Sequence, residues 1–201
     1  LLGLVGSEMC IRDSINNKNI FLLIILGSIP LVIVGYIFYS TNLIDQFRNL
    51  KVVAWTTLIF GILLYFSDKF ELKNKISSEL NIKSIIIIGL FQILAIIPGV
   101  SRSGIVITAS RFLKFDRVES SKIAFYLSIP ALAGASVLGF KDVIDDQINF
   151  DAIFIFSTSA SFLFSYFTIK YFLIYVKMFS LSFFVIYRIV LSIILFSIIY
   201  L

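Results

Sequence analysis

The sequence contains no histidine and only one cysteine, Cys10. Without histidine, the chain lacks the side chain that most often exchanges protons near neutral pH, and with it the commonest acid–base group. A single cysteine cannot form a disulfide within the chain, and no cluster of cysteine and histidine has the spacing of a metal site. These absences exclude an internal disulfide and a Cys/His metal module.

Charged residues are also scarce. They make up 14% of the chain, against about 25% in soluble domains. Hydrophobic residues reach 59%, and the mean hydropathy is +1.02. So much apolar surface has no interior to enter except a lipid bilayer. The basic residues behind the net charge of +5 lie in short segments between apolar runs, which indicates orientation in a membrane rather than nucleic-acid binding. We therefore expect an all-α, polytopic integral membrane protein without a nucleic-acid partner.

Five apolar runs are predicted to span the membrane. They cover residues 20–39, 52–66, 123–140, 152–176 and 179–200. Two other runs, 84–97 and 105–113, are too short to cross comfortably, since a spanning helix needs roughly 20 residues. We expect these two runs to form a re-entrant helix pair over residues 84–113.

The charges that flank this pair favour the re-entrant arrangement. The segment 68–83 carries Lys69, Lys73, Lys75 and Lys83, and the segment 111–122 carries Arg111, Lys114, Arg117 and Lys122. A single crossing would place these two groups on opposite sides of the membrane. A hairpin places both on one side, together with Lys177, and leaves the acidic segment 141–151 opposite, as the positive-inside rule requires. We interpret Lys69, Lys73, Lys114 and Arg117 as solvated topology charges that could also contact anionic lipid.

Residues 1–14 do not fit the periodic pattern that follows them. They have neither the charged start nor the long apolar stretch of a signal peptide. We expect this segment to be a foreign or truncation-scar sequence. Residues 15–201 are then a single transmembrane domain that includes the re-entrant pair 84–113.

The segment 98–104, PGVSRSG, is a polar break between the two short apolar runs. Pro98 has no N–H and interrupts a helix. Gly99 and Gly104 permit backbone conformations and close approaches that other residues resist. Irregular backbone at membrane depth is tolerated only where protein or a wet cavity covers it. The break is therefore expected to lie against other helices or a cavity.

The side chains of this break are typical of an anion site. Ser101 and Ser103 carry hydroxyls and can cap a helix that begins near Ile105. Arg102 carries a planar set of donors that suits phosphate, and free N–H groups at a helix start favour an anion. An arginine at membrane depth costs several kcal/mol without a partner, which favours a phosphate-bearing ligand. The alternative is a kinked helix whose Arg102 extends to the interface.

The residues around this break resemble a known family. GLFQILAIIPGVSRSG, followed by SKIAFYLSIPALAGAS, is similar to the second signature region of the bacterial undecaprenyl-diphosphatase family of the bacitracin-resistance type. The ending FFVIYRIVLSIILF resembles that family's last helix, and IPLVIVGYIF and LIFGILLYF resemble its middle helices. The similarity covers roughly residues 20–200.

The resemblance implies a multi-pass phosphatase of the bacterial cytoplasmic (inner) membrane. It would convert undecaprenyl diphosphate to undecaprenyl phosphate and phosphate, which recycles the lipid carrier of cell-wall synthesis. The family is built from two inverted repeats, each with a re-entrant pair. The partners implied are a polyprenyl diphosphate and membrane lipid. The oligomeric state stays open, with a homodimer among the forms considered.

The resemblance also assigns roles to residues of the break. Arg102 would bind the diphosphate and act in catalysis with Ser101. The substrate contacts implied are Ser103, Gly99, Gly104 and Gln92. Mg²⁺ or Ca²⁺ would assist by neutralising phosphate charge, and no metal ligand is identified in this chain. Gln92 could equally form a hydrogen bond within the helix bundle.

The sequence also departs from the family pattern. The family's first signature, a Glu-rich segment ending in Ser-Ser-Thr-Gly-His, is not found in the sequence. We therefore expect the first repeat to be missing and this chain to be inactive alone. Val106 stands where the family usually has threonine, and Thr108 is not an evident substitute. Competing interpretations are a lipid flippase or transporter of a phosphate-bearing substrate, and an inert membrane remnant.

Arg188, inside the last apolar run, allows two interpretations. It could contact a second phosphate or a partner. A structural ion pair, or a side chain that extends to the interface, is the interpretation favoured by the sequence.

Overall fold

The computed structural model describes residues 18–41, 47–69, 80–145 and 152–200, with the side chains of 18, 19, 138, 140–145 and 152 left aside. Every regular element in these ranges is a helix, apart from an isolated bridge at Phe115. The protein is therefore an all-α, multi-pass membrane protein, as the composition predicts. The predictions made for residues 1–14 lie outside the described residues.

Among the described residues, four helices are long and apolar enough to cross a membrane. They are α2 (Lys18–Ser40), α4 (Leu50–Asp68), α9 (Ala152–Met178) and α10 (Ser182–Tyr200). The fifth predicted run, 123–140, lies within α8 (Arg117–Asp145) and is helical. That α8 crosses the membrane stays a prediction.

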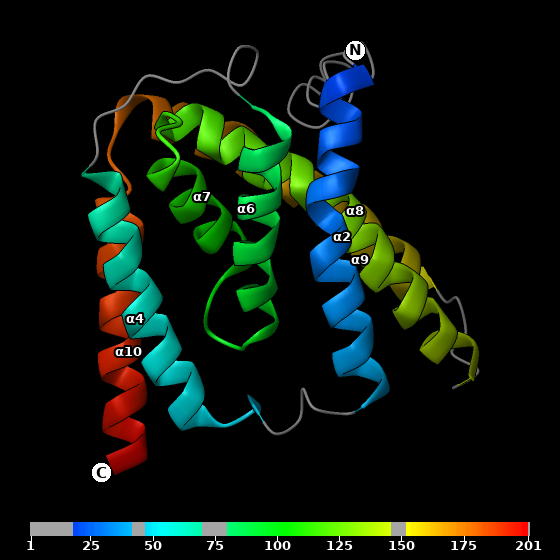
Figure 1. Ribbon diagram of the computed structural model, residues 1–201. Helices are drawn as coiled ribbons and strands as arrows, with labels where there is room; N and C mark the ends of the chain where they lie inside the picture. The colour runs from blue at the N-terminus through cyan, green and yellow to red at the C-terminus, as the bar shows by residue number, and fades with distance from the viewer. Residues whose placement is uncertain (1–17, 42–46, 70–79, 146–151, 201) are drawn as a thin grey trace.

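The segment 84–113 forms the predicted helical hairpin. It consists of α6 (Ile82–Ile93), a short 3₁₀ turn η1 (Leu94–Ile96) and α7 (Arg102–Phe112). Figure 1 shows α6 and α7 side by side, joined by a turn that points away from the Asp68 end of α4. From Asp68 back to Thr56, which contacts the turn, α4 rises about 18 Å out of about 28 Å. The turn therefore lies at membrane depth when α4 crosses.

Helices α4 and α10 pack along a regular seam. The buried residues of α4 alternate at spacings of three and four, the pattern that keeps one stripe of a helix facing its partner; they are Ala54, Thr57, Gly61, Leu64 and Asp68, with Ser67 beside them. The buried residues of α10 are Val185, Arg188 and Ser192. Ser192 Oγ donates to the Ala54 carbonyl at 3.0 Å. This seam sets Arg188 directly against α4.

Helices α2 and α6 approach closely at two glycines. A Cβ on Gly89 would collide with the backbone of Gly27, and a Cβ on Gly27 would lie 2.7 Å from Ile85 Cγ1. Small residues of this kind let helices in a membrane bring their backbones together. Helix α2 therefore packs closely against α6, the first helix of the hairpin.

A buried carboxylate, Asp68, joins several helix ends at the base of the hairpin. Arg117 donates to it through Nε at 2.6 Å, and the N–H of Leu181 donates at 3.0 Å. Arg111 donates to the Asp68 carbonyl at 3.0 Å. The ends of α4 and α7 and the starts of α8 and α10 therefore meet at one end, which supports the hairpin inferred from the loop charges.

The same cluster corrects the interpretation of Arg117 as a solvated topology charge. Its guanidinium forms a two-point ion pair with Asp68, whose side chain is only 7% exposed. Arg111 is likewise buried. The packing of four helix ends around one carboxylate buries Asp68 and Arg111 and leaves the Arg117 side chain 35% exposed. Sequence spacing does not reveal such packing.

Candidate functional site

The turn between α6 and α7 has a backbone that few residues could adopt. Ile97 is extended, as expected for a residue before proline. Gly99 has φ +91°, and a Cβ there would collide with Thr56 Oγ1 and lie 2.7 Å from the Val53 carbonyl oxygen. Ser101 also has a positive φ, +66°, which is uncommon outside glycine. The turn is therefore a specialised structure held by its surroundings.

Two threonines of α4 hold one side of this turn. Thr56 Oγ1 donates to the Pro98 carbonyl at 2.6 Å, and Thr57 Oγ1 donates to the Gly99 carbonyl at 3.4 Å. A carbonyl without a donor at membrane depth would cost several kcal/mol. These hydroxyls therefore allow non-helical backbone inside the bundle.

Arg188 of α10 holds the other side of the turn. Its Nη2 donates to the Gly99 carbonyl at 2.7 Å and to the Val100 carbonyl at 3.0 Å, and Nη1 donates to Val100 at 3.0 Å. Nε donates to the Thr57 carbonyl at 3.4 Å. The residue is 7% exposed and forms no ion pair with any described residue.

The favoured prediction for Arg188, an ion pair or extension to the interface, is therefore wrong. The carbonyl oxygens of the turn point toward α10, and they take up its donors instead. Because no described carboxylate balances its charge, Arg188 leaves a positive centre beside the turn.

Helix α7 begins at the turn and directs its N-terminus to the same region. Ser101 is the N-cap residue, and its Oγ accepts a hydrogen bond from the Gly104 N–H at 3.3 Å. The first N–H groups of a helix have no partner within the helix, and the partial positive charge there favours anions. The start of α7 and the guanidinium of Arg188 are therefore both positive, and both attract an anion to this region.

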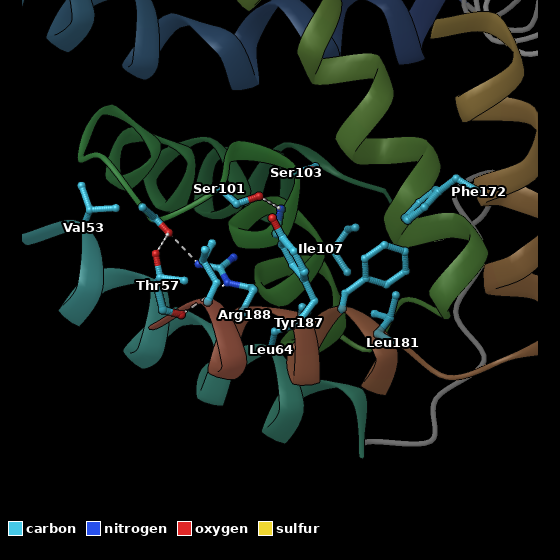
Figure 2. A pocket seen from close by; sticks show the side chains of 14 residues that line it. Val53, Thr57, Leu64, Ser101, Ser103, Ile107, Phe172, Leu181, Tyr187 and Arg188 are labelled. Carbon is cyan, nitrogen blue, oxygen red and sulfur yellow. Dashed lines mark hydrogen bonds between the residues drawn. The ribbon is translucent and has the colours of Figure 1, made fainter. Parts of the chain in front are cut away.

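A cavity of about 470 Å³ opens where these groups meet. Its polar wall consists of Thr57, Gly99, Ser101, Ser103, Gly104 and Arg188. The rest of the lining is largely apolar and comes from α4, α7, α9 and α10: Val53, Leu64, Ile107, Phe172, Leu181, Phe184, Tyr187 and Leu191. Figure 2 shows Ser101 beside Arg188, with Phe172 and Leu181 farther along the cavity. The cavity is amphipathic, with hydroxyls and a cation at one end and aromatic and aliphatic groups at the other.

Four of the six predicted site residues line this cavity. They are Ser101, Ser103, Gly99 and Gly104. Arg102 is half-buried at the first position of α7 and is not part of the lining. It has no hydrogen-bond or ion-pair partner in the described part of the chain.

Gln92 lies apart from the cavity lining and is fully buried. Neither its Oε1 nor its Nε2 has a hydrogen-bond partner among the residues described. Thr108 does not replace the threonine missing at Val106, because its Oγ1 donates to the Gly104 carbonyl at 2.8 Å and it does not line the cavity. The roles predicted for Gln92 and Arg102 stay predictions.

The sequence analysis missed the threonine pair Thr56 and Thr57. Hydroxyl residues inside an apolar run often form interhelical hydrogen bonds, and this signal was present in the sequence. It could not identify the partner, because the turn lies 42 residues away in the chain. The apolar wall from α9 and α10 carried no signal that separates it from lipid-facing surface.

The lining contains no carboxylate, and no group of three or more His, Cys, Asp or Glu residues in the described ranges could hold a metal ion. The residues present therefore do not by themselves fit the Mg²⁺ or Ca²⁺ that the resemblance implies. The arrangement can bind and neutralise an anion, and no described lining residue supplies a strong general base.

Comparison with known proteins agrees with the resemblance. The family model described as "Bacitracin resistance protein BacA" matches residues 4–194. The chain is 58% identical over 189 residues to an undecaprenyl-diphosphatase of Pelagibacter ubique, covering 94% of this chain and 74% of that protein. It is 42% identical over 177 residues to one of Elusimicrobium minutum, covering 88% and 67% of the two chains. For one of Thermobifida fusca the identity is 34% over 176 residues, and this chain spans 60% of its length. The family match begins within the segment 1–14, whose proposed foreign origin stays a prediction.

Proposed function

The chain belongs to the bacitracin resistance protein BacA family, and on this premise we propose that it acts in the hydrolysis of undecaprenyl diphosphate to undecaprenyl phosphate and phosphate. One observation supports this most strongly. The cavity joins a cationic, hydroxyl-lined end to an apolar wall, which suits a ligand with an anionic headgroup and a prenyl tail. Its location in the bacterial cytoplasmic (inner) membrane is part of the same proposal.

In this proposal the turn binds the headgroup. The hydroxyls of Ser101 and Ser103 and the free N–H groups of α7 contact phosphate oxygens. Arg102 stands between these two serines, and because no described residue holds its guanidinium, it can turn to the same anion. Donors fixed before the reaction stabilise negative charge as it develops on the phosphate.

The described residues supply binding and charge stabilisation rather than proton transfer. Phosphoryl transfer also needs a positioned nucleophile or base, and the cavity lining offers no carboxylate or imidazole for this step. We keep Mg²⁺ or Ca²⁺ as a proposed cofactor on the resemblance alone, and no step runs through a metal held by these residues. A homodimer likewise stays a proposal.

The proposal is tested by binding of a short prenyl diphosphate to the purified chain in detergent. We expect farnesyl diphosphate to bind at least about tenfold more tightly than farnesol, which corresponds to about 1.4 kcal/mol. Ser101→Ala, Ser103→Ala and Arg102→Ala should each weaken the diphosphate and leave farnesol unchanged. Equal affinities for the two ligands in the unaltered chain would contradict the proposal.

A lipid flippase or transporter of a phosphate-bearing substrate is the second candidate. The broken hairpin at membrane depth favours it, because discontinuous helices are typical of transporters. Two assays separate the phosphatase from the flippase: phosphate release and lipid flipping. Both are measured on a longer family member and on its variant in which the arginine equivalent to Arg102 is replaced by alanine. Loss of phosphate release without loss of flipping supports the phosphatase, and the reverse supports the flippase.

A further inference from the structure

Arg188 has more donors than the turn uses. A guanidinium has five N–H donors, and four of them reach the carbonyls of Thr57, Gly99 and Val100. The remaining N–H is on Nη1 and has no acceptor in the described part of the chain. A buried donor without a partner is unusual and calls for a cause.

The nitrogen that carries the remaining donor, Arg188 Nη1, lies beside the start of α7. A Cβ on Gly104 would lie 3.0 Å from Arg188 Nη1 and 3.2 Å from Ser101 Oγ. Because Gly104 has no side chain, the space between this nitrogen and this hydroxyl stays open. Both residues line the cavity, so a ligand oxygen in that space can contact both.

The charge of Arg188 is also unbalanced. The groups that face it are carbonyls of α4 and of the turn, with Gly61 and Gly104 leaving room for its stem and head. A buried arginine paired only with neutral carbonyls keeps its full positive charge, which is costly in an apolar bundle. An anion that enters the cavity would reduce that cost.

Resting on the proposed function, we infer that Arg188 binds the phosphate headgroup directly through its remaining Nη1 N–H. The same guanidinium positions Ser101 by holding the carbonyl of the residue before it. Arg188 is thus a second phosphate-binding cation, supplied by the last helix and distinct from Arg102. The same side chain therefore holds the turn in shape and binds the anionic headgroup.

Three variants of the chain in detergent micelles test this inference with farnesyl diphosphate and farnesol as probes. Arg188→Lys keeps a charge but cannot form the planar set of bonds. Gly104→Ala keeps the Arg188 side chain and its charge, and places a methyl group 3.0 Å from Nη1, in the space between this nitrogen and Ser101 Oγ. Ser192→Ala, one helical turn from Arg188 in the same seam, removes a hydrogen bond between two residues that do not line the cavity, Ser192 and Ala54.

We expect Arg188→Lys and Gly104→Ala to bind farnesyl diphosphate about tenfold or more weakly, with farnesol affinity unchanged. Ser192→Ala should bind both ligands within about threefold of the unaltered chain. The salt dependence of diphosphate binding should be weaker in Arg188→Lys, because its ammonium no longer lies against the headgroup. The salt dependence therefore distinguishes an Arg188 that binds the headgroup from an Arg188 that only holds the turn in place.

Gly104→Ala keeps the test decisive if Arg188→Lys fails to fold, because alanine favours a helix over glycine. Unchanged diphosphate affinity in folded Gly104→Ala or in folded Arg188→Lys would overturn the inference. Absence of any diphosphate preference in the unaltered chain would instead contradict the proposed function, so the two failures are distinguishable.

Discussion

The two ends of the hairpin both bury an arginine, but they satisfy it in different ways. At the base, Arg111 and Arg117 share the carboxylate of Asp68, which compensates part of their positive charge. At the turn, Arg188 contacts only backbone carbonyls and retains one unused donor. The difference separates a structural anchor from a ligand site: compensated charge holds helix ends together, and uncompensated charge leaves an affinity for an anion.

The largest stability effect is expected at the base. Asp68→Asn removes the buried carboxylate that Arg111 and Arg117 share, so the free energy of unfolding should fall by about 3 kcal/mol or more. Chemical unfolding in detergent measures this. Lys122→Gln, which breaks the more exposed pair with Glu119, should change stability by no more than about 0.5 kcal/mol. Equal effects of the two variants would show that the base is not an anchor.

The next effect is expected from the backbone of the turn. Gly99→Ala forces a side chain onto φ +91° and against Thr56, and should lower the free energy of unfolding by about 2 kcal/mol. Gly35→Ala is the matched control, because a Cβ there has open space. Thermal unfolding of the two variants side by side gives the comparison, and a tolerated Gly99→Ala would contradict the close contact with α4.

Two substitutions of Ser101 distinguish its effect on stability from its effect on ligand binding. Ser101→Ala keeps a side chain at φ +66° and loses the N-cap oxygen, so stability should fall by about 1 kcal/mol. Ser101→Gly relieves the backbone and should stay within about 0.5 kcal/mol of the unaltered chain. Both variants should bind farnesyl diphosphate more weakly. A stable Ser101→Gly with full affinity would show that the hydroxyl does not contact the ligand.

The tether from α4 is expected to affect stability about as much as Ser101→Ala and to affect binding less. Thr56→Val removes one hydrogen bond to the Pro98 carbonyl and should lower the free energy of unfolding by about 1 kcal/mol. Farnesyl diphosphate affinity should change less than it does in Arg188→Lys, because Thr56 carries no charge and does not line the cavity. Calorimetric titration measures both affinities, and a larger loss in Thr56→Val would reverse the assignment.

Much of the hairpin could be predicted from the sequence, because its signals are local. The short apolar runs, the break at Pro98 and the basic residues on both flanks predict a helix pair, and the structure shows one. The hydroxyls of Ser101 and Ser103 were predicted to lie in a site, and they line the cavity. These features depend on the thirty residues of the segment 84–113 and on the basic residues directly before and after it.

The partners of the arginines could not be predicted, because they depend on which distant helices meet. Arg188 contacts the turn across 88 residues of chain, and Arg117 contacts Asp68 across 49. The α4 residues that pack against α10 have a regular spacing in the sequence. That spacing does not indicate which helix they pack against. For this reason the sequence favours an ion pair or extension to the interface for Arg188, which lines the cavity, and a solvated charge for Arg117, which anchors the helix ends.

The most direct test of this account is the ratio of the dissociation constants for farnesol and farnesyl diphosphate, measured in Arg188→Gln and in folded Asp68→Asn. The account predicts that the preference for the diphosphate falls about tenfold or more in Arg188→Gln and persists in Asp68→Asn despite its lower stability. If the preference is lost in Asp68→Asn and retained in Arg188→Gln, the account is contradicted. It holds that the Asp68 end of the hairpin is structural and that the turn binds phosphate.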